Sequence, residues 1–178
     1  IKSHQKASLG NGNIMKYILM YYKEPKDFSS FVMLSQIMAG EAIKVAVESH
    51  RMAMPYCMGS LYWQLNDCWP GASWSSLDYF GNWKALHYYA KNFFNPLLIC
   101  ADIHSDIMNV YVVNDGELIK QSKILIELYD FKGTLVFEEI IIMDIKANSS
   151  TNVYSDKKNK VLNGLHTNNI MLRTSIYI

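Results

Sequence analysis

The segment GSLYWQLNDCWPGASWSS, residues 59–76, combines aromatic rings with polar side chains in a way that suits sugar binding. It holds three of the four tryptophans of the chain, together with the adjacent pair Asn66 and Asp67. A pyranose ring offers a patch of C–H groups that packs on an aromatic face, and a rim of hydroxyls that needs donors and acceptors. We therefore predict that Trp63 supplies the platform and that Asn66 and Asp67 supply the polar rim.

Structural roles for the same residues stay open at this point. Trp63 is equally compatible with an ordinary core ring. Asp67 suits a cap of the next turn or an ion pair with Lys84 somewhat better than a direct contact with sugar. We expect Trp74 and Trp83 to be packing residues, and the serines of the segment to form turns through local backbone hydrogen bonds.

The cysteines show no pattern of a metal site or of a complete set of disulfides. Cys57, Cys68 and Cys100 lack metal-ligand spacing, and an odd number cannot be fully paired within the chain. We expect buried thiols here and no metal site. Likewise His4 and His87 have no partner pattern typical of metal or nucleophilic chemistry, so we interpret them as structural.

Composition indicates a folded globular chain without a nucleic-acid or membrane partner. Half of the residues are apolar and only 19% are charged, which argues against disorder. The net charge is +1 and no basic block stands out, so a nucleic-acid surface is not indicated. No apolar run is expected to span a bilayer. GNG at residues 10–12 is expected to be a loop, because no strand and helix flank it as a phosphate-binding loop requires.

The first half of the chain, residues 1–95, contains the elements that must position the aromatic segment. A long helix with a broad apolar face is predicted from Asp27 or Ser29 to about Met52. A strand without alternation follows within 57–65, as is typical of a parallel strand buried on both sides. Another helix follows within 82–94.

A single strand between two helices cannot bury its own faces. Residues 1–95 are therefore predicted to be the C-terminal part of a (β/α)8 barrel. In that fold the segment after the strand lies on the face where barrel enzymes place their sites.

The second half, residues 96–178, is predicted to be an immunoglobulin-like β-sandwich, truncated at its end. Alternating apolar residues separated by turns predict strands, and a polar stretch at 147–152 interrupts the pattern. The predicted strands lie at 106–113, 123–130, 134–145 and 170–178. The fold class is thus α/β plus all-β, with the boundary at Asn95–Pro96. The first residue is not Met and the last lies within an alternating pattern, so we expect a piece of a longer protein.

A long motif in the first half resembles the end of the catalytic barrel of the β-mannosidases in glycoside hydrolase family 2. The motif is LYWQLND-x-WP-x-x-SWSS-x-D-Y-x-G-x-WK-A-L-H-Y at 61–88, preceded by FSSFVMLSQIMAGEAIKVAVESHR at 28–51. A weaker similarity continues upstream and through the sandwich. The resemblance implies a retaining exo-glycosidase that removes terminal β-linked mannose without a metal or organic cofactor. Its carbohydrate partners would be β-mannosides, mannan or N-glycan-derived oligosaccharides, and the compartment stays open.

The resemblance also implies roles for individual residues. Trp63 would lie at the end of the eighth barrel strand and line the subsite for the terminal mannose. Asn66 and Asp67 would follow on the same rim, or shape the loop. Alternatives are another family 2 glycosidase, such as an exo-β-glucosaminidase or a β-galactosidase, or a module that only binds carbohydrate or braces the barrel.

Both catalytic glutamates of such enzymes are expected upstream of residue 1. In the family the nucleophile has a Ser-Glu-Phe-Gly-like context and the acid/base lies near a Gly/Asn-Glu turn. No glutamate of this chain has either context at a strand end; those considered are Glu24, Glu41, Glu48, Glu117, Glu127, Glu138 and Glu139. We therefore expect no catalytic residue in this chain, and no activity from it alone.

Overall fold

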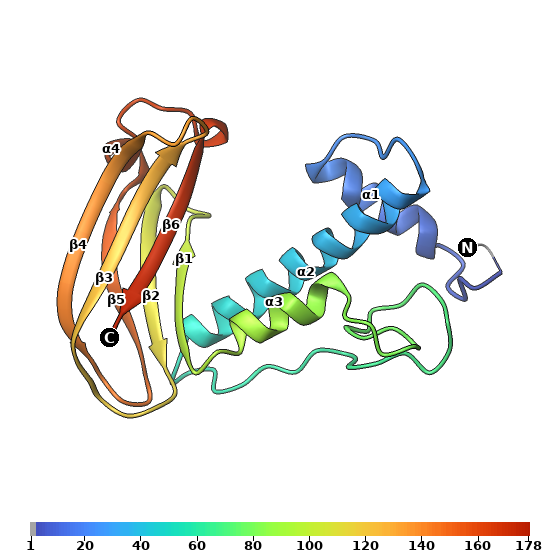
Figure 1. The fold of residues 1–178 in the computed structure, drawn as a ribbon, viewed down its shortest axis with the longest axis horizontal. Coiled ribbons are helices and arrows are strands. Elements are labelled where there is room, and N and C mark those ends of the chain that lie inside the picture. The colour runs from blue at the N-terminus through green and yellow to red at the C-terminus, as the bar shows by residue number, and fades with distance from the viewer. Residues whose placement is uncertain (1–2) are drawn as a thin grey trace. The chain divides into compact units, whose positions relative to one another are not determined.

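The computed structural model describes residues 3–178, which divide into two compact units (Figure 1). The first unit holds the residues up to Val47 together with Ser60–Phe94, and the second holds Glu48–Gly59 together with Asn95–Ile178. The second unit therefore includes a short stretch that precedes the predicted boundary. That residues 1–95 are part of a barrel stays a prediction.

Three helices form the regular part of the first unit: α1 (Gly10–Tyr21), α2 (Phe28–Met52) and α3 (Ala85–Phe93). The long predicted helix is confirmed as α2. Asp27 caps its start, because its Oδ1 accepts hydrogen bonds from the Ser30 backbone N–H at 2.7 Å and from the Ser30 hydroxyl at 2.6 Å. Such a cap satisfies backbone donors that have no partner within the helix.

Helix α1 corrects the prediction of a loop at residues 10–12. Gly10 and Gly12 belong to its first turn rather than to a loop. Glycine lowers the stability of a helix by about 1 kcal/mol relative to alanine, and for this reason two glycines predict a loop. The helix nevertheless buries Ile18 completely, and we attribute its formation to this packing.

Helices α2 and α3 pack against each other in the first unit. Val47 of α2 forms a buried cluster with Leu86, Ala90 and Phe93 of α3. The two helices approach closely at Gly40, where an added Cβ atom would lie only 2.5 Å from the ring of Tyr89. A side chain at this position would therefore require the ring of Tyr89 or the helices themselves to shift.

The predicted strand within 57–65 is wrong, because these residues form an irregular segment. A parallel strand exists only as part of a ladder with neighbouring strands. Residues 60–65 lie in the first unit, and the described part of that unit contains no strand. Its isolated bridges join Asn66 to Leu77 and Leu77 to Trp83, just outside this segment. Apolar composition alone therefore did not decide the backbone of this segment.

The second unit is a β-sandwich of two antiparallel sheets (Figure 1). One sheet has the order β1-β2-β5 and the other β4-β3-β6. The strands are β1 (Leu97–Asp102), β2 (Ile107–Asn114), β3 (Ile119–Asp130), β4 (Leu135–Ile145), β5 (Ser149–Lys157) and β6 (Ile170–Tyr177). A short helix, α4 (Lys158–Leu162), and a 3-10 turn (Thr167–Asn169) lie between β5 and β6.

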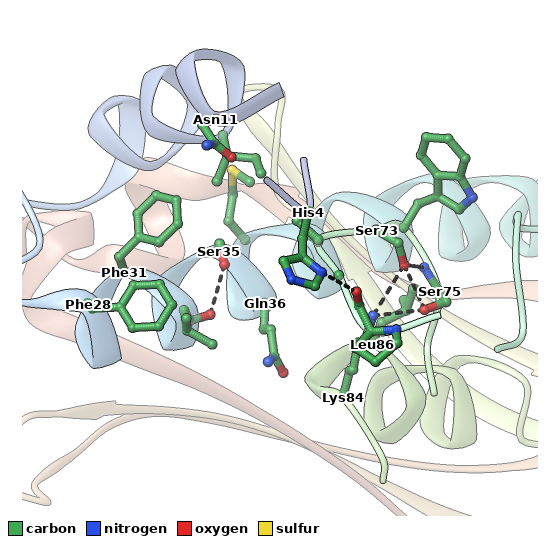
Figure 2. Close-up of a pocket in the computed structure, with 18 residues that line it drawn as sticks. His4, Asn11, Phe28, Phe31, Ser35, Gln36, Ser73, Ser75, Lys84 and Leu86 are labelled. Atoms are coloured by element: carbon green, nitrogen blue, oxygen red, sulfur yellow. Dashed lines mark hydrogen bonds between the residues drawn. The ribbon is translucent and has the colours of Figure 1, made fainter. Parts of the chain in front are cut away.

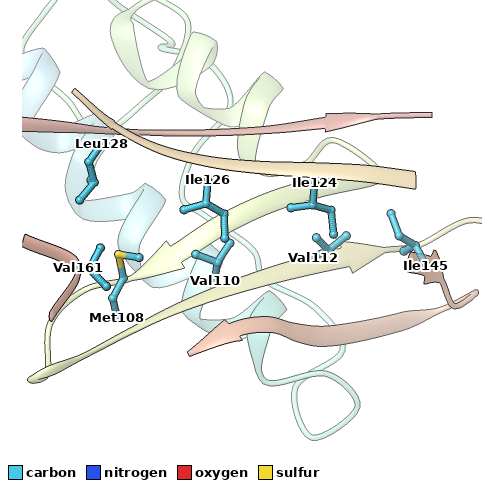
Figure 3. Packing of buried hydrophobic residues seen from close by; sticks show 8 residues of the cluster. All are labelled: Met108, Val110, Val112, Ile124, Ile126, Leu128, Ile145 and Val161. Carbon is cyan, nitrogen blue, oxygen red and sulfur yellow. The ribbon is translucent and has the colours of Figure 1, made fainter. Parts of the chain in front are cut away.

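The core of the sandwich follows from the alternation of the two central strands, which face each other in Figure 3. Every second residue of β3 points to every second residue of β2, as a side-chain period of two requires. The buried cluster consists of Met108, Val110, Val112, Ile124, Ile126, Leu128, Ile145 and Val161. The predicted sandwich is confirmed.

Two strands of the sandwich were not predicted from the sequence. β1 follows directly after Pro96, and β5 begins at Ser149, inside the polar stretch that was expected to interrupt the sheet. β5 lies at an edge of its sheet and pairs with β2 over its whole length. Backbone pairing with a buried strand outweighs the low strand preference of serine and asparagine.

The end of α2 belongs to the second unit because side chains fix it to the strands. Arg51 donates to the Asn95 carbonyl at 2.7 Å and to Asp115 Oδ2 at 2.6 Å. Ser150 donates to the Met52 carbonyl at 2.9 Å. Met52 also packs, with Met54, on a second buried cluster of the sandwich.

Helix α2 is long and apolar enough to span a bilayer by length and composition, with a mean hydropathy of 1.4 over its most apolar window. This corrects the expectation that no apolar run reaches that length. A helix in the core of a water-soluble protein passes the same test, so hydropathy alone does not indicate a membrane partner.

Candidate functional site

The aromatic segment 59–76 is closed at its base by backbone hydrogen bonds. The Leu77 N–H donates to the Leu65 carbonyl at 2.8 Å, and the Asp67 N–H donates to the Leu77 carbonyl at 3.1 Å. The Lys84 N–H donates to the Ser76 carbonyl at 2.9 Å. These bonds hold the chain on both sides of residues 68–75, so that this loop projects from a fixed base.

Inside the loop, polar side chains converge on the ammonium group of Lys84, which lies beside Ser73 and Ser75 in Figure 2. Lys84 Nζ is 2.7 Å from Asp67 Oδ2, 2.8 Å from Ser75 Oγ and 3.3 Å from Ser73 Oγ. Ser73 in turn donates to Asp67 Oδ1. Both carboxylate oxygens of Asp67 are therefore engaged within the loop.

Asp67 is ionised at neutral pH for reasons that the structure makes plain. The residue is only 7% exposed, and this burial raises the pKa of its carboxyl. Hydrogen bonds from Lys84, Ser73 and Ser75, together with the charge of Lys84, outweigh burial and leave the pKa below its ordinary value. The ion pair with Lys84, one of the structural alternatives for Asp67, is thus confirmed.

A second polar cluster surrounds the fully buried Ser76. Its hydroxyl lies 2.9 Å from the Tyr62 hydroxyl and 3.0 Å from His87 Nδ1, and it donates to the Leu65 carbonyl at 2.9 Å. The ring of His87 also lies edge-on to Trp83. The structural interpretation of His87 is therefore confirmed. His4 likewise makes a structural contact, because its Nδ1 lies 2.9 Å from the carbonyl of Pro70, a residue of the loop.

Trp63 and Asn66 are open to solvent. The indole of Trp63 is 73% exposed, so it is not a core ring of this unit. Asn66 is exposed as well, and its amide makes a long hydrogen bond of 3.3 Å to the Asp67 carbonyl. Of the three predicted site residues, two are therefore accessible, whereas Asp67 is buried in the support of the loop.

The other predictions for this segment hold in part. Trp74 was expected to be a packing residue, but it is 64% exposed. Trp83 packs edge-on against His87 and Tyr88, although 46% of its surface stays exposed. The serines do more than form turns, because Ser73 and Ser75 bind the ion pair.

The three cysteines lie within the described residues and none forms a disulfide. Cys100 is buried, as expected, but Cys57 is half-buried and Cys68 is exposed. Cys68 lies in the loop whose polar side chains turn inward to Lys84, which leaves its own side chain outside.

A cavity of about 500 Å³ lies in the first unit between α1, the first half of α2 and the loop (Figure 2). Its lining is mainly apolar and includes Phe31, Val32, Trp74 and Leu86. Trp63, Asn66 and Asp67 do not line it. The predicted sugar platform and this cavity are therefore different places.

The acidic side chains of the first unit serve structural roles almost throughout. Asp27 caps α2, Glu41 accepts a hydrogen bond from Tyr89, Asp67 binds Lys84, and Asp78 accepts bonds from Phe80 and Asn82 in a turn. Between residues 3 and 178, no group of three or more His, Cys, Asp and Glu side chains could hold a metal ion. The acidic side chains named here are thus engaged in hydrogen bonds and an ion pair of the first unit.

Comparisons with known proteins agree with the motif. Residues 106–178 match a family model described as "Mannosidase Ig/CBM-like domain". The β-mannosidase of Capra hircus is 32% identical over 170 residues, which are 87% of this chain and 19% of that enzyme. The β-mannosidase of Bos taurus is 30% identical, with the same shares of the two chains covered. This chain thus spans about a fifth of the length of these curated relatives.

Solved structures extend the similarity to the backbone. A β-D-mannosidase from Dictyoglomus thermophilum superposes with a TM-score of 0.89 and 30% identity, covering 99% of this chain and 21% of that chain. An exo-chitosanase from Amycolatopsis orientalis has a similar fold, with a TM-score of 0.66 and 21% identity over 80% of this chain and 17% of its own. The resemblance first stated from the motif is thereby confirmed.

Proposed function

Because the chain resembles the β-mannosidases of glycoside hydrolase family 2 over most of its length, we propose that it is part of a retaining exo-β-mannosidase. Such an enzyme releases terminal β-linked mannose from the non-reducing ends of glycans. The observation that carries the proposal is the open indole of Trp63, 73% exposed at the base of a fixed loop. A large exposed aromatic ring in an ordered segment suits a binding surface.

In the proposed subsite, Trp63 packs against the C–H face of the terminal mannose. The Asn66 amide, exposed and three residues further on, binds hydroxyls at the rim. Asp67 acts differently from the first expectation: its two oxygens are bound by Lys84 and Ser73, so it shapes the loop instead of contacting sugar.

The reaction needs two carboxyl groups that other parts of the enzyme supply. Retaining glycosidases place a nucleophile and an acid/base about 5 Å apart. The aspartates and the glutamate named above in the first unit are held in caps, turns and ion pairs. We therefore propose that the chain contributes sugar contacts and structure, and that it does not hydrolyse glycosides alone.

Substitution of Trp63 in the full-length enzyme tests the proposal. Loss of one stacking contact costs about 1–3 kcal/mol, by analogy with bases on aromatic rings, or about 5- to 150-fold in kcat/KM. Trp63→Ala should cause a loss of this size on an aryl β-mannoside, and Trp63→Phe a smaller one. Phe80→Ala is the matched control, because Phe80 is 75% exposed and lies outside the subsite.

Three results would contradict the proposal. Trp63→Ala could stay within about twofold of wild type, which would make the ring an ordinary surface residue. Wild-type enzyme could prefer an aryl β-galactoside or β-glucosaminide over the β-mannoside. Finally, the purified 178-residue chain could show turnover that disappears when one of its own glutamates is replaced.

A further inference from the structure

We propose that Lys84 is a positioning residue of the sugar subsite: its ammonium group ties three acceptors of the aromatic loop together and thereby fixes the direction of Asn66 and Trp63. The inference rests on the proposed function, because it assigns Lys84 a role in that same subsite. It follows from the geometry of the hydrogen bonds around Lys84 Nζ.

The donors of Lys84 match the acceptors of the loop in number. A lysine ammonium group has three N–H donors and no acceptor. Its neighbours are Asp67 Oδ2 at 2.7 Å, Ser75 Oγ at 2.8 Å and Ser73 Oγ at 3.3 Å. These partners lie between nine and seventeen residues away in the sequence, so one group joins both ends of the loop.

The backbone of Lys84 is itself fixed, which gives the ammonium group a firm base. Its N–H donates to the Ser76 carbonyl at 2.9 Å. The next residue, Ala85, begins α3, and its N–H donates to Gln36 Oε1 of α2 at 3.0 Å. Lys84 thus connects the loop to the helices of the first unit.

The connection from Lys84 to the subsite is short. Asp67 follows Asn66 directly, and the Asp67 N–H and the Asn66 bridge both join this part of the chain to Leu77. Further along, the carbonyls of Gln64 and Leu65 each accept a hydrogen bond from the Ser76 N–H at 3.1 Å. A displacement of Asp67 therefore moves Asn66 and strains the bonds that hold the backbone after Trp63.

Burial makes the pair sensitive to loss of either partner. The side chain of Asp67 is 5% exposed and that of Lys84 16% exposed. Removing the ammonium group leaves a buried carboxylate without its counter-charge, which is strongly destabilising, whereas removing both charges is far less so. Arginine cannot substitute for lysine here, because its planar fork does not place donors toward three separate acceptors.

A double-substitution experiment on the full-length enzyme separates positioning from stability. Lys84→Met should lower kcat/KM on an aryl β-mannoside by at least about tenfold and should lower the thermal midpoint. The double variant Lys84→Met/Asp67→Asn should recover most of the thermal midpoint, because no unpaired charge remains buried. It should keep the low kcat/KM, because the ammonium group that joins Asp67, Ser73 and Ser75 to the start of α3 is then absent.

Matched variants sharpen the result. Lys84→Arg should not restore activity, and Lys91→Met, an exposed lysine of α3, should stay within about twofold of wild type. Recovery of activity together with the thermal midpoint in the double variant would overturn the inference, since the network would then be merely structural.

Two further outcomes also decide the matter. Lys84→Met with wild-type kinetics, in an enzyme that Trp63→Ala impairs, overturns the positioning role and leaves the proposed function standing. A wild-type enzyme that hydrolyses no β-mannoside overturns the proposed function, and with it this inference.

Discussion

Ile126→Ala should destabilise the sandwich strongly, because Ile126 lies at the centre of its core. The side chain is fully buried and belongs to the cluster between β2 and β3 (Figure 3). β3 is the central strand of its sheet, with β4 on one side and β6 on the other. Backbone pairing on both sides leaves the surroundings little freedom to close a cavity.

The expected magnitude follows from that position. Truncation of a buried isoleucine to alanine costs about 2–5 kcal/mol, and a site that cannot relax lies in the upper part of this range, at about 3–5 kcal/mol. Domains of this size are stable by about 5–15 kcal/mol, so the loss is a large share of the total. With a urea dependence of about 2 kcal/mol per molar, the midpoint should fall by about 1.5–2.5 M.

Ile142→Ala is the matched control, because it removes the same atoms from a neighbouring strand of the same sheet. Ile142 of β4 is 70% exposed, so its truncation should cost less than about 1 kcal/mol and shift the midpoint by less than about 0.5 M. Urea titrations of both variants, followed by far-ultraviolet circular dichroism, compare them directly. Equal shifts, or a shift below about 0.5 M for Ile126→Ala, would refute the packing described for the sandwich.

The remaining predictions concern one titration and one buried hydrogen-bond network. Burial, a hydrogen bond donated to Glu41 and the charge of Glu41 raise the pKa of Tyr89 from 10.0 to about 12. The group thus stabilises the folded state below about pH 10 and loses this contribution as the pH rises toward 12. An ultraviolet titration should show one tyrosine that ionises later than the others, and this late step should be missing in Tyr89→Phe. If the step missing from Tyr89→Phe instead had the ordinary tyrosine pKa, the prediction would be contradicted. Asn114→Ala should cost about 2–3 kcal/mol in urea titrations, because the Asn114 side chain, in a residue 2% exposed, binds three backbone groups. The exposed Asn152→Ala is its control, and an equal loss from both would show that the network is not needed.

The spacing of apolar residues correctly predicted those elements that bury one face through their own side chains. The apolar face of α2 and its cap at Asp27 both follow from the spacing of residues within that segment. The alternation of apolar residues in β2 and β3 likewise predicted a sandwich. In these elements one face is buried, and the sequence must repeat with the period of the backbone that buries it.

Residue spacing gave a wrong prediction where a segment distant in the sequence determines the secondary structure. The polar start of β5 is a strand because β2 lies beside it. The apolar segment 57–65 is irregular, and the described part of the first unit, which holds residues 60–65, offers it no neighbouring strand. Neither outcome is contained in the composition of the segment itself.

The sequence by itself determined which residues are available for the candidate site, because the long motif around Trp63 and Asn66 carried both the resemblance to the β-mannosidases and the prediction of an aromatic platform. Only the tertiary structure decided that Asp67 turns inward to Lys84 and that Trp63 stays open to solvent. The physical reason is that the spacing of apolar residues indicates which face of a helix or strand is buried. A hydrogen bond between side chains seventeen residues apart depends instead on where the fold brings their backbones together.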